Sequence, residues 1–162
     1  MPFVTTPITK SPTRSAAKER ATPRGPTRRD EWVRRVRGAL RAQYSELCAS
    51  PLCELPGVLA LARTDYRRKI FPTASALRAL LEQACDMALA ELDGVHERRV
   101  QQVATYLQLA REGVSVTTIT HRLGLHSRSY VHQEIQRQAL ELITEAFLQL
   151  ARQADESSNA AC

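Results

Sequence analysis

Apolar residues recur every three to four positions along most of this chain, and glycine or proline interrupts the pattern between segments. That spacing places the apolar side chains on one face of an α-helix. Hydrophobic residues make up 43% of the chain, whereas aromatic residues make up only 5%. Such a composition suits packed helices better than a sheet. We therefore expect an all-α, multi-helix fold in a chain of 162 residues, which is the length of one domain.

Residues 1–29 differ from the rest of the chain in composition and charge. They carry seven Lys and Arg residues against one acid, Glu19, so the net charge of +6 lies in this segment. Pro12, Pro23 and Pro26 interrupt any helix, and the segment has too little apolar surface to offset the entropy of ordering. We expect a disordered basic arm, which either lies along DNA phosphates or enters a minor groove, or serves only as a solubilising tail.

Residues 30–94 are expected to be a helical N-terminal region without a motif that assigns a role; sensing a ligand, dimerising and supporting the DNA-reading region are the open alternatives. Asp30 is placed to cap the first helix, and Ser50-Pro51 to begin a short one. Asp93-Gly94 is expected to end a strongly apolar helix. Four arginines occupy the other faces of the first helix, where they form either a solvated surface or a strip facing DNA: Arg34, Arg35, Arg37 and Arg41.

Residues 95–154 contain the most informative succession of helix stop and start signals. A first helix ends at Gly113, Ser115 caps a short second helix, Gly124 supplies a tight turn, and a long third helix follows Ser127. A helix that enters a DNA groove needs a short bracing helix and a turn before it. The order of elements therefore predicts a helix-turn-helix, followed by a frayed tail over residues 155–162.

Between about Val100 and Arg137, the segment resembles the helix-turn-helix of the LuxR-type and sigma region 4-like bacterial families. Their pattern reads roughly G-L-S-x-x-E-I-A-x-x-L-G-L-S-x-x-T-V, and the matching residues are Gly113, Ser115, Ile119, Leu123, Gly124, Leu125 and Val131. Thr120 stands where a small alanine is usual, and Val131 comes one residue late, which predicts a longer turn. The resemblance implies promoter binding by a transcriptional regulator, with the second helix of the motif in the major groove.

With Val131 and Ile135 inward, the start of the third helix presents polar side chains to the outside. Glutamine pairs bidentately with adenine, and arginine binds guanine or a phosphate. We expect base contacts from four residues: Ser129, His132, Gln133 and Gln136. We expect phosphate contacts from four others: Arg122, Ser127, Arg128 and Arg137.

No phosphate loop, nucleophile elbow or zinc-protease motif is present, so we expect neither an enzyme nor a cofactor. His121, His126 and His132 surround the turn without ligand spacing, and we expect no metal site. The absence of a long apolar run predicts no membrane association and a cytoplasmic location. The expected partner is double-stranded DNA, and a second copy of the chain is a further candidate partner. The alternative is a helical adaptor that dimerises, or docks to RNA polymerase or another regulator, without reading DNA.

Overall fold

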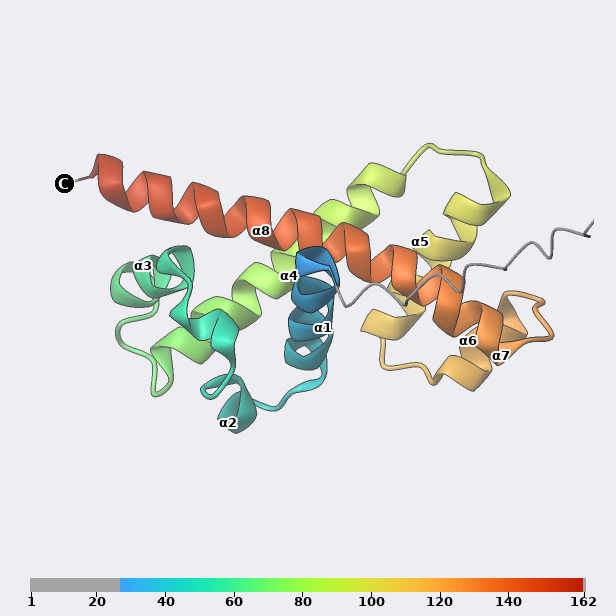
Figure 1. Cartoon of the computed structure of the whole chain (residues 1–162), viewed down its shortest axis with the longest axis horizontal. Helices are drawn as coiled ribbons and strands as arrows, with labels where there is room; N and C mark the ends of the chain where they lie inside the picture. The colour runs from blue at the N-terminus through green and yellow to red at the C-terminus, as the bar shows by residue number, and fades with distance from the viewer. Residues whose placement is uncertain (1–26, 162) are drawn as a thin grey trace, which may run out of the picture.

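The computed structural model describes residues 27–161, and every regular element in that range is helical. Figure 1 shows the long helix α8 crossing the molecule, with α3 near its C-terminal half and α5–α7 near its N-terminal end. The all-α prediction is confirmed. The elements are α1 (Arg28–Arg41), α2 (Tyr44–Leu47), η1 (Pro51–Glu54), α3 (Pro56–Thr64), α4 (Pro72–Leu92), α5 (Arg98–Arg111), α6 (Val116–Arg122), α7 (Arg128–Tyr130), η2 (Val131–Ile135) and α8 (Gln136–Ala160).

The core is centred on α3, α4 and α8, which all pack against one another. Phe147 of α8 and the leucines Leu77 and Leu81 of α4 are the large side chains that fill it. Gly57 lets α3 approach α8 closely, because a Cβ at that position would overlap the carbonyl oxygen of Ala151 and lie 2.7 Å from its carbonyl carbon. Close packing of this kind leaves little room for a change in side-chain volume.

The first helix begins earlier than the sequence predicts. Thr27 is the N-cap of α1: its hydroxyl accepts from the Asp30 N–H at 3.2 Å, and the Asp30 carboxylate accepts from the Thr27 N–H at 2.9 Å. This reciprocal arrangement is a capping box, so the prediction that Asp30 is the cap is wrong. Arg28 and Arg29 belong to α1, which corrects the end of the predicted basic arm. The rest of that arm, residues 1–26, lies outside the described residues.

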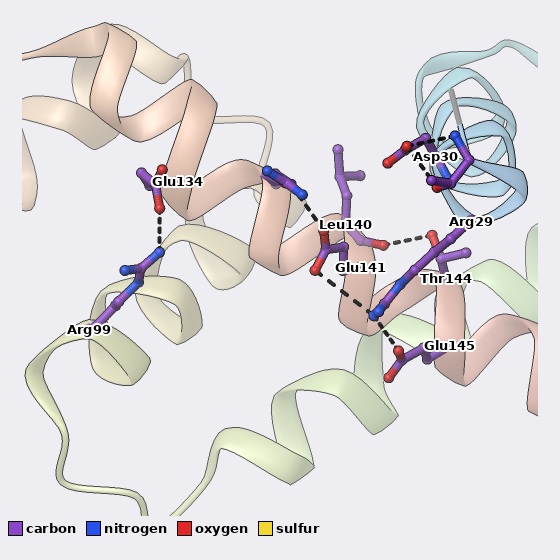
Figure 2. Close-up of polar contacts among 10 residues, drawn as sticks. Arg29, Asp30, Arg99, Glu134, Leu140, Glu141, Thr144 and Glu145 are labelled. Atoms are coloured by element: carbon purple, nitrogen blue, oxygen red, sulfur yellow. Dashed lines mark hydrogen bonds and ion pairs between the residues drawn. The ribbon is translucent and has the colours of Figure 1, made fainter. Parts of the chain in front are cut away.

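Arg29 also connects the start of α1 to α8. Its guanidinium pairs with Glu145 and lies 3.9 Å from Glu141 (Figure 2). All three side chains are at least partly exposed, and exposed ion pairs contribute little to folding free energy. The contact shows that this end of α1 lies beside α8.

Several predicted helix ends are confirmed, but the predicted frayed tail is not. Ser50 caps η1, and Gly94 follows α4 with a φ of 76°. Helix α8 continues through Asp155 to Ala160, so residues 155–160 are helical. The segment Asp155–Ala160 contains neither glycine nor proline, and the side chain of Asn159 donates to that of Asp155 one turn earlier. Polar composition alone does not end a helix.

Candidate nucleic-acid interface

Helices α5 and α6 form the support for the start of the third helix. Helix α5 ends before Gly113, whose φ of 79° reverses the chain, and the hydroxyl of Ser115 caps α6 by accepting from the Thr118 N–H at 3.3 Å. Ile119 of α6 and Val131 of η2 are fully buried. Their burial holds the short helix and the start of the long one in the same core.

Thr120 departs from the usual alanine without leaving an unsatisfied polar group. Its side chain is buried, and its hydroxyl donates to the carbonyl oxygen of Val116 at 2.7 Å. A threonine can satisfy its hydroxyl in this way one helical turn back. The substitution is therefore compatible with the tight packing of α6.

The turn after α6 is built by Gly124 and Ser127. Gly124 has a φ of 65°, and the following N–H of Leu125 donates to the Thr120 carbonyl at 3.0 Å, closing the C-terminal end of α6. Ser127 then caps α7, because its hydroxyl accepts from the Tyr130 N–H at 3.2 Å. These positions agree with the helix end and helix start that the sequence predicts.

The sequence does not predict that the third helix contains a π-helical turn. Over Val131–Ile135 the hydrogen bonds span five residues, and the N–H of Gln136 donates to the carbonyl of Val131. A π turn accommodates one residue more than an α turn. Val131, Ile135 and Gln136 can therefore all face the core, and all three are buried. The prediction that Gln136 faces outward is wrong.

The other seven predicted contact residues lie on the outside of the molecule. Ser129, His132 and Gln133 are exposed near the start of the third helix. Two of the predicted phosphate contacts also make contacts within the chain: Arg128 donates to the Thr117 hydroxyl at 3.2 Å, and Arg137 donates to Glu141 at 3.0 Å. Arg122, Ser127, Arg128 and Arg137 are all exposed.

Buried Gln136 orients the exposed imidazole of His132. The Oε1 atom of Gln136 lies 2.8 Å from Nδ1 of His132. With Oε1 as the acceptor, Nδ1 carries the proton, and Nε2 of the neutral ring remains an acceptor. Burial raises the pKa of the Tyr106 phenol, and a hydrogen bond with the Gln136 side chain opposes that rise. Gln136 thus lies near a core phenol and within hydrogen-bonding distance of a surface imidazole.

The chain segment that forms the turn contains no acidic side chain. Between Glu112 and Glu134 the sequence contains no Asp or Glu, but it contains Arg122, Arg128 and three histidines. Glu134, the acid at the far edge, is paired with Arg99 of α5 (Figure 2). This part of the molecule therefore presents an uncompensated basic surface, although the chain beyond residue 29 is formally neutral.

Among the described residues, no group of three or more His, Cys, Asp or Glu side chains is arranged to hold a metal ion. Burial raises the pKa of the Cys53 and Cys85 thiols, which disfavours the reactive thiolate. Within residues 27–161, no helix combines the length and apolar character that a bilayer span requires.

Comparison with protein-family models, curated proteins and solved structures finds no match to this chain.

Proposed function

We propose that this protein is a sequence-specific DNA-binding transcriptional regulator, and that α7 with the start of η2 enters the major groove. The observation that carries the proposal is the exposed, acid-free surface from Ser127 to Gln133 at the start of the third helix. The short helix α6 and the Gly124 turn precede that surface. A helix-turn-helix presents its reading helix in this manner, and the sequence resembles the LuxR-type and sigma region 4-like motif.

Three exposed side chains have the chemistry to contact bases. Gln133 offers a donor and an acceptor to adenine, and the hydroxyl of Ser129 can serve as either. His132 offers Nε2 as an acceptor, since Gln136 occupies Nδ1. Gln136 is buried in the core, so it is not proposed as a base contact. Its proposed role is to fix the orientation of the His132 imidazole.

Phosphate contacts would come from residues on both sides of the reading surface. Arg122 ends α6, Ser127 caps α7 and Arg128 begins it. Arg137 lies nine residues after Arg128, more than two turns further along the third helix, beside Glu141. Cationic side chains placed on both edges of a reading helix fix its register on the duplex. Because residues 30–162 are formally neutral, the basic residues 1–29 or a second subunit would supply further affinity.

Selection from a random duplex library by the full-length chain tests this proposal. We expect recovery of a consensus site, and we expect binding to that site to weaken steeply with salt. Gln133→Ala should weaken binding to the consensus by about tenfold and relax the preference at one base pair, because a bidentate base contact contributes about 1–3 kcal/mol. Arg122→Gln should weaken binding to all duplexes alike and reduce the salt slope by about one.

Matched controls lie on the distant half of α8. Gln149 and Arg152 are both exposed there, so Gln149→Ala and Arg152→Gln should leave affinity and specificity unchanged. Absence of duplex binding by the folded wild-type chain would refute the proposal and favour the adaptor alternative. Equal losses in the control variants would place the DNA contacts somewhere other than α6 and α7.

A further inference from the structure

A cavity separates the N-terminal helices from the proposed DNA-reading end. It has a volume of about 690 Å³ and lies between α1, α4, α5, α6 and α8. This volume falls within the range of about 300–1,000 Å³ that is typical of small-molecule sites. Its apolar walls include Leu81, Leu107, Val116, Ile119, Leu140 and Ile143. The cavity is open on one side, and an apolar group could lie against these side chains.

Two polar side chains reach this cavity from the core. Tyr106 is 6% exposed and Gln136 is 5% exposed, and both line the cavity. Polar groups that converge on a site with apolar walls orient a ligand. A ligand would thus meet apolar walls together with one phenol and one amide.

The rim of the cavity is cationic. Arg37 and Arg41 lie one turn apart on α1, are exposed, and take part in no ion pair within residues 27–161. The other two arginines of the lining are engaged: Arg78 donates to the Ala42 carbonyl at 2.6 Å, and Arg111 pairs with Asp86. The lining contains a single acid, Glu82.

We propose that this cavity is a binding site for a small organic monocarboxylate with an apolar body. The apolar body would lie among the leucines and isoleucines, and the carboxylate would bind Arg37 and Arg41 at the rim. Guanidinium groups match carboxylates in planar, bidentate geometry. A neutral apolar ligand would fill the same walls but would leave the two arginines without an anion.

The cavity is connected to the proposed reading surface through Gln136. This residue lines the cavity, and its Oε1 atom lies 2.8 Å from Nδ1 of His132. A ligand that moves the Gln136 amide would release the imidazole and change the affinity for DNA. Thermodynamic linkage then requires DNA to change the affinity for the ligand by the same factor. This regulatory step rests on the proposed DNA-binding function, whereas the ligand site does not.

Isothermal titration calorimetry of the full-length chain with octanoate, 4-phenylbutyrate and octan-1-ol tests the site. We expect one carboxylate to bind per chain, and octan-1-ol to bind at least about tenfold more weakly, which corresponds to about 1.4 kcal/mol. The double variant Arg37→Gln/Arg41→Gln should lower carboxylate affinity to that of the alcohol. Arg34→Gln is the matched control, since Arg34 is exposed on the same helix but does not line the cavity.

A variant that fills the cavity tests whether the carboxylate binds there. Ala110 is exposed at the rim, so Ala110→Trp should abolish binding while the circular dichroism spectrum is retained. Ala90→Trp, at an exposed position on α4 outside the lining, should bind normally. The proposal is overturned if the folded wild-type chain binds neither carboxylate, if it binds octan-1-ol equally well, or if Ala110→Trp binds as wild type.

The regulatory step is tested in a separate experiment, which measures the affinity of the chain for the selected duplex with and without octanoate. A change in affinity that disappears in Gln136→Leu supports the connection through His132. An unchanged affinity overturns the regulatory step but leaves the ligand site intact. Carboxylate binding by a chain that binds no duplex would instead refute the proposed function alone.

Discussion

The packed body of this molecule and the end that contains α6 and α7 differ in how many side chains they bury. In the body, α3, α4 and α8 pack large side chains such as Phe147 against small residues, and Gly57 allows backbone contact. At the other end, the short helix α6 contributes only Ile119 and Thr120 as buried residues. There the third helix contains a π turn and keeps polar side chains exposed. The body thus contains most of the buried side chains, whereas the surface around α6 and α7 consists mainly of exposed polar side chains.

The largest expected effect on stability is in the body, at Gly57. Gly57→Ala places a Cβ against the backbone of Ala151, which cannot rotate away as a side chain would. Helices α3 and α8 must separate, and we expect a loss of about 3 kcal/mol in the free energy of unfolding. Urea denaturation followed by circular dichroism measures the loss.

Gly38→Ala is the matched control for this variant. A Cβ at Gly38, an exposed position in α1, meets nothing within 4 Å. We therefore expect the opposite sign, a gain of about 0.5–1 kcal/mol, because alanine loses less conformational entropy than glycine in a helix. Equal behaviour of the two variants would contradict the close approach of α3 to α8.

A smaller effect is expected at the start of α1, outside the packed body. Thr27→Ala removes the capping hydroxyl and should cost about 1 kcal/mol at neutral pH. Its hydrogen bonds with Thr27 lower the pKa of the Asp30 carboxyl below the ordinary value of 3.8. At pH values above 3.8 the ionised Asp30 carboxyl therefore stabilises the folded state. This contribution is lost as the pH falls through the lowered pKa of the folded state.

The stability difference between wild type and Thr27→Ala should therefore narrow as the pH is lowered below 3.8. Urea denaturation at neutral and acidic pH measures the difference. Thr105→Ala, an exposed threonine within α5, provides a control without a cap and should show no narrowing. A constant difference across this pH range would contradict the role of the ionised Asp30 in the capping box.

Sequence reasoning succeeded where local chemistry alone decides the structure. Gly94, Gly113 and Gly124 all adopt positive φ after helices, and Ser115 and Ser127 both cap. These features depend on a few adjacent residues, which can be read directly from the sequence. The same reasoning placed the cap of α1 at Asp30, because a carboxylate at the third helical position is also part of a capping box.

Features that depend on tertiary packing were not predictable in the same way. A strictly α-helical period places Gln136 on the outside, whereas the π turn places it inside beside Tyr106. The sequence carries one signal for the position of Tyr106. It follows Val103 by three residues, and this spacing places both side chains on the same face of α5, where both are buried. The cavity depends on five helices meeting, and no local pattern contains that information.

The smallest expected effect on stability is at the π turn, and it separates the two ends most sharply. Deletion of Gln133 removes the extra residue, so Val131, Ile135 and Gln136 would stand at the first, fourth and fifth positions of a regular α-helix. That spacing keeps all three on the core face. We expect the free energy of unfolding to change by no more than about 0.5 kcal/mol, while binding to the consensus duplex weakens by about tenfold or more, because the Gln133 side chain is lost.

Deletion of Gln149 is the matched control, because that residue lies in a regular part of α8. Removing it rotates the residues that follow, including the buried Leu150 and Ala151, away from the core, and should destabilise the fold strongly. Thermal unfolding and binding to the selected duplex are measured on both variants. If deletion of Gln133 is as destabilising as deletion of Gln149, the π turn is required for packing. If deletion of Gln133 changes neither thermal unfolding nor duplex binding, Gln133 does not contact DNA, and the π turn is required neither for packing nor for DNA recognition.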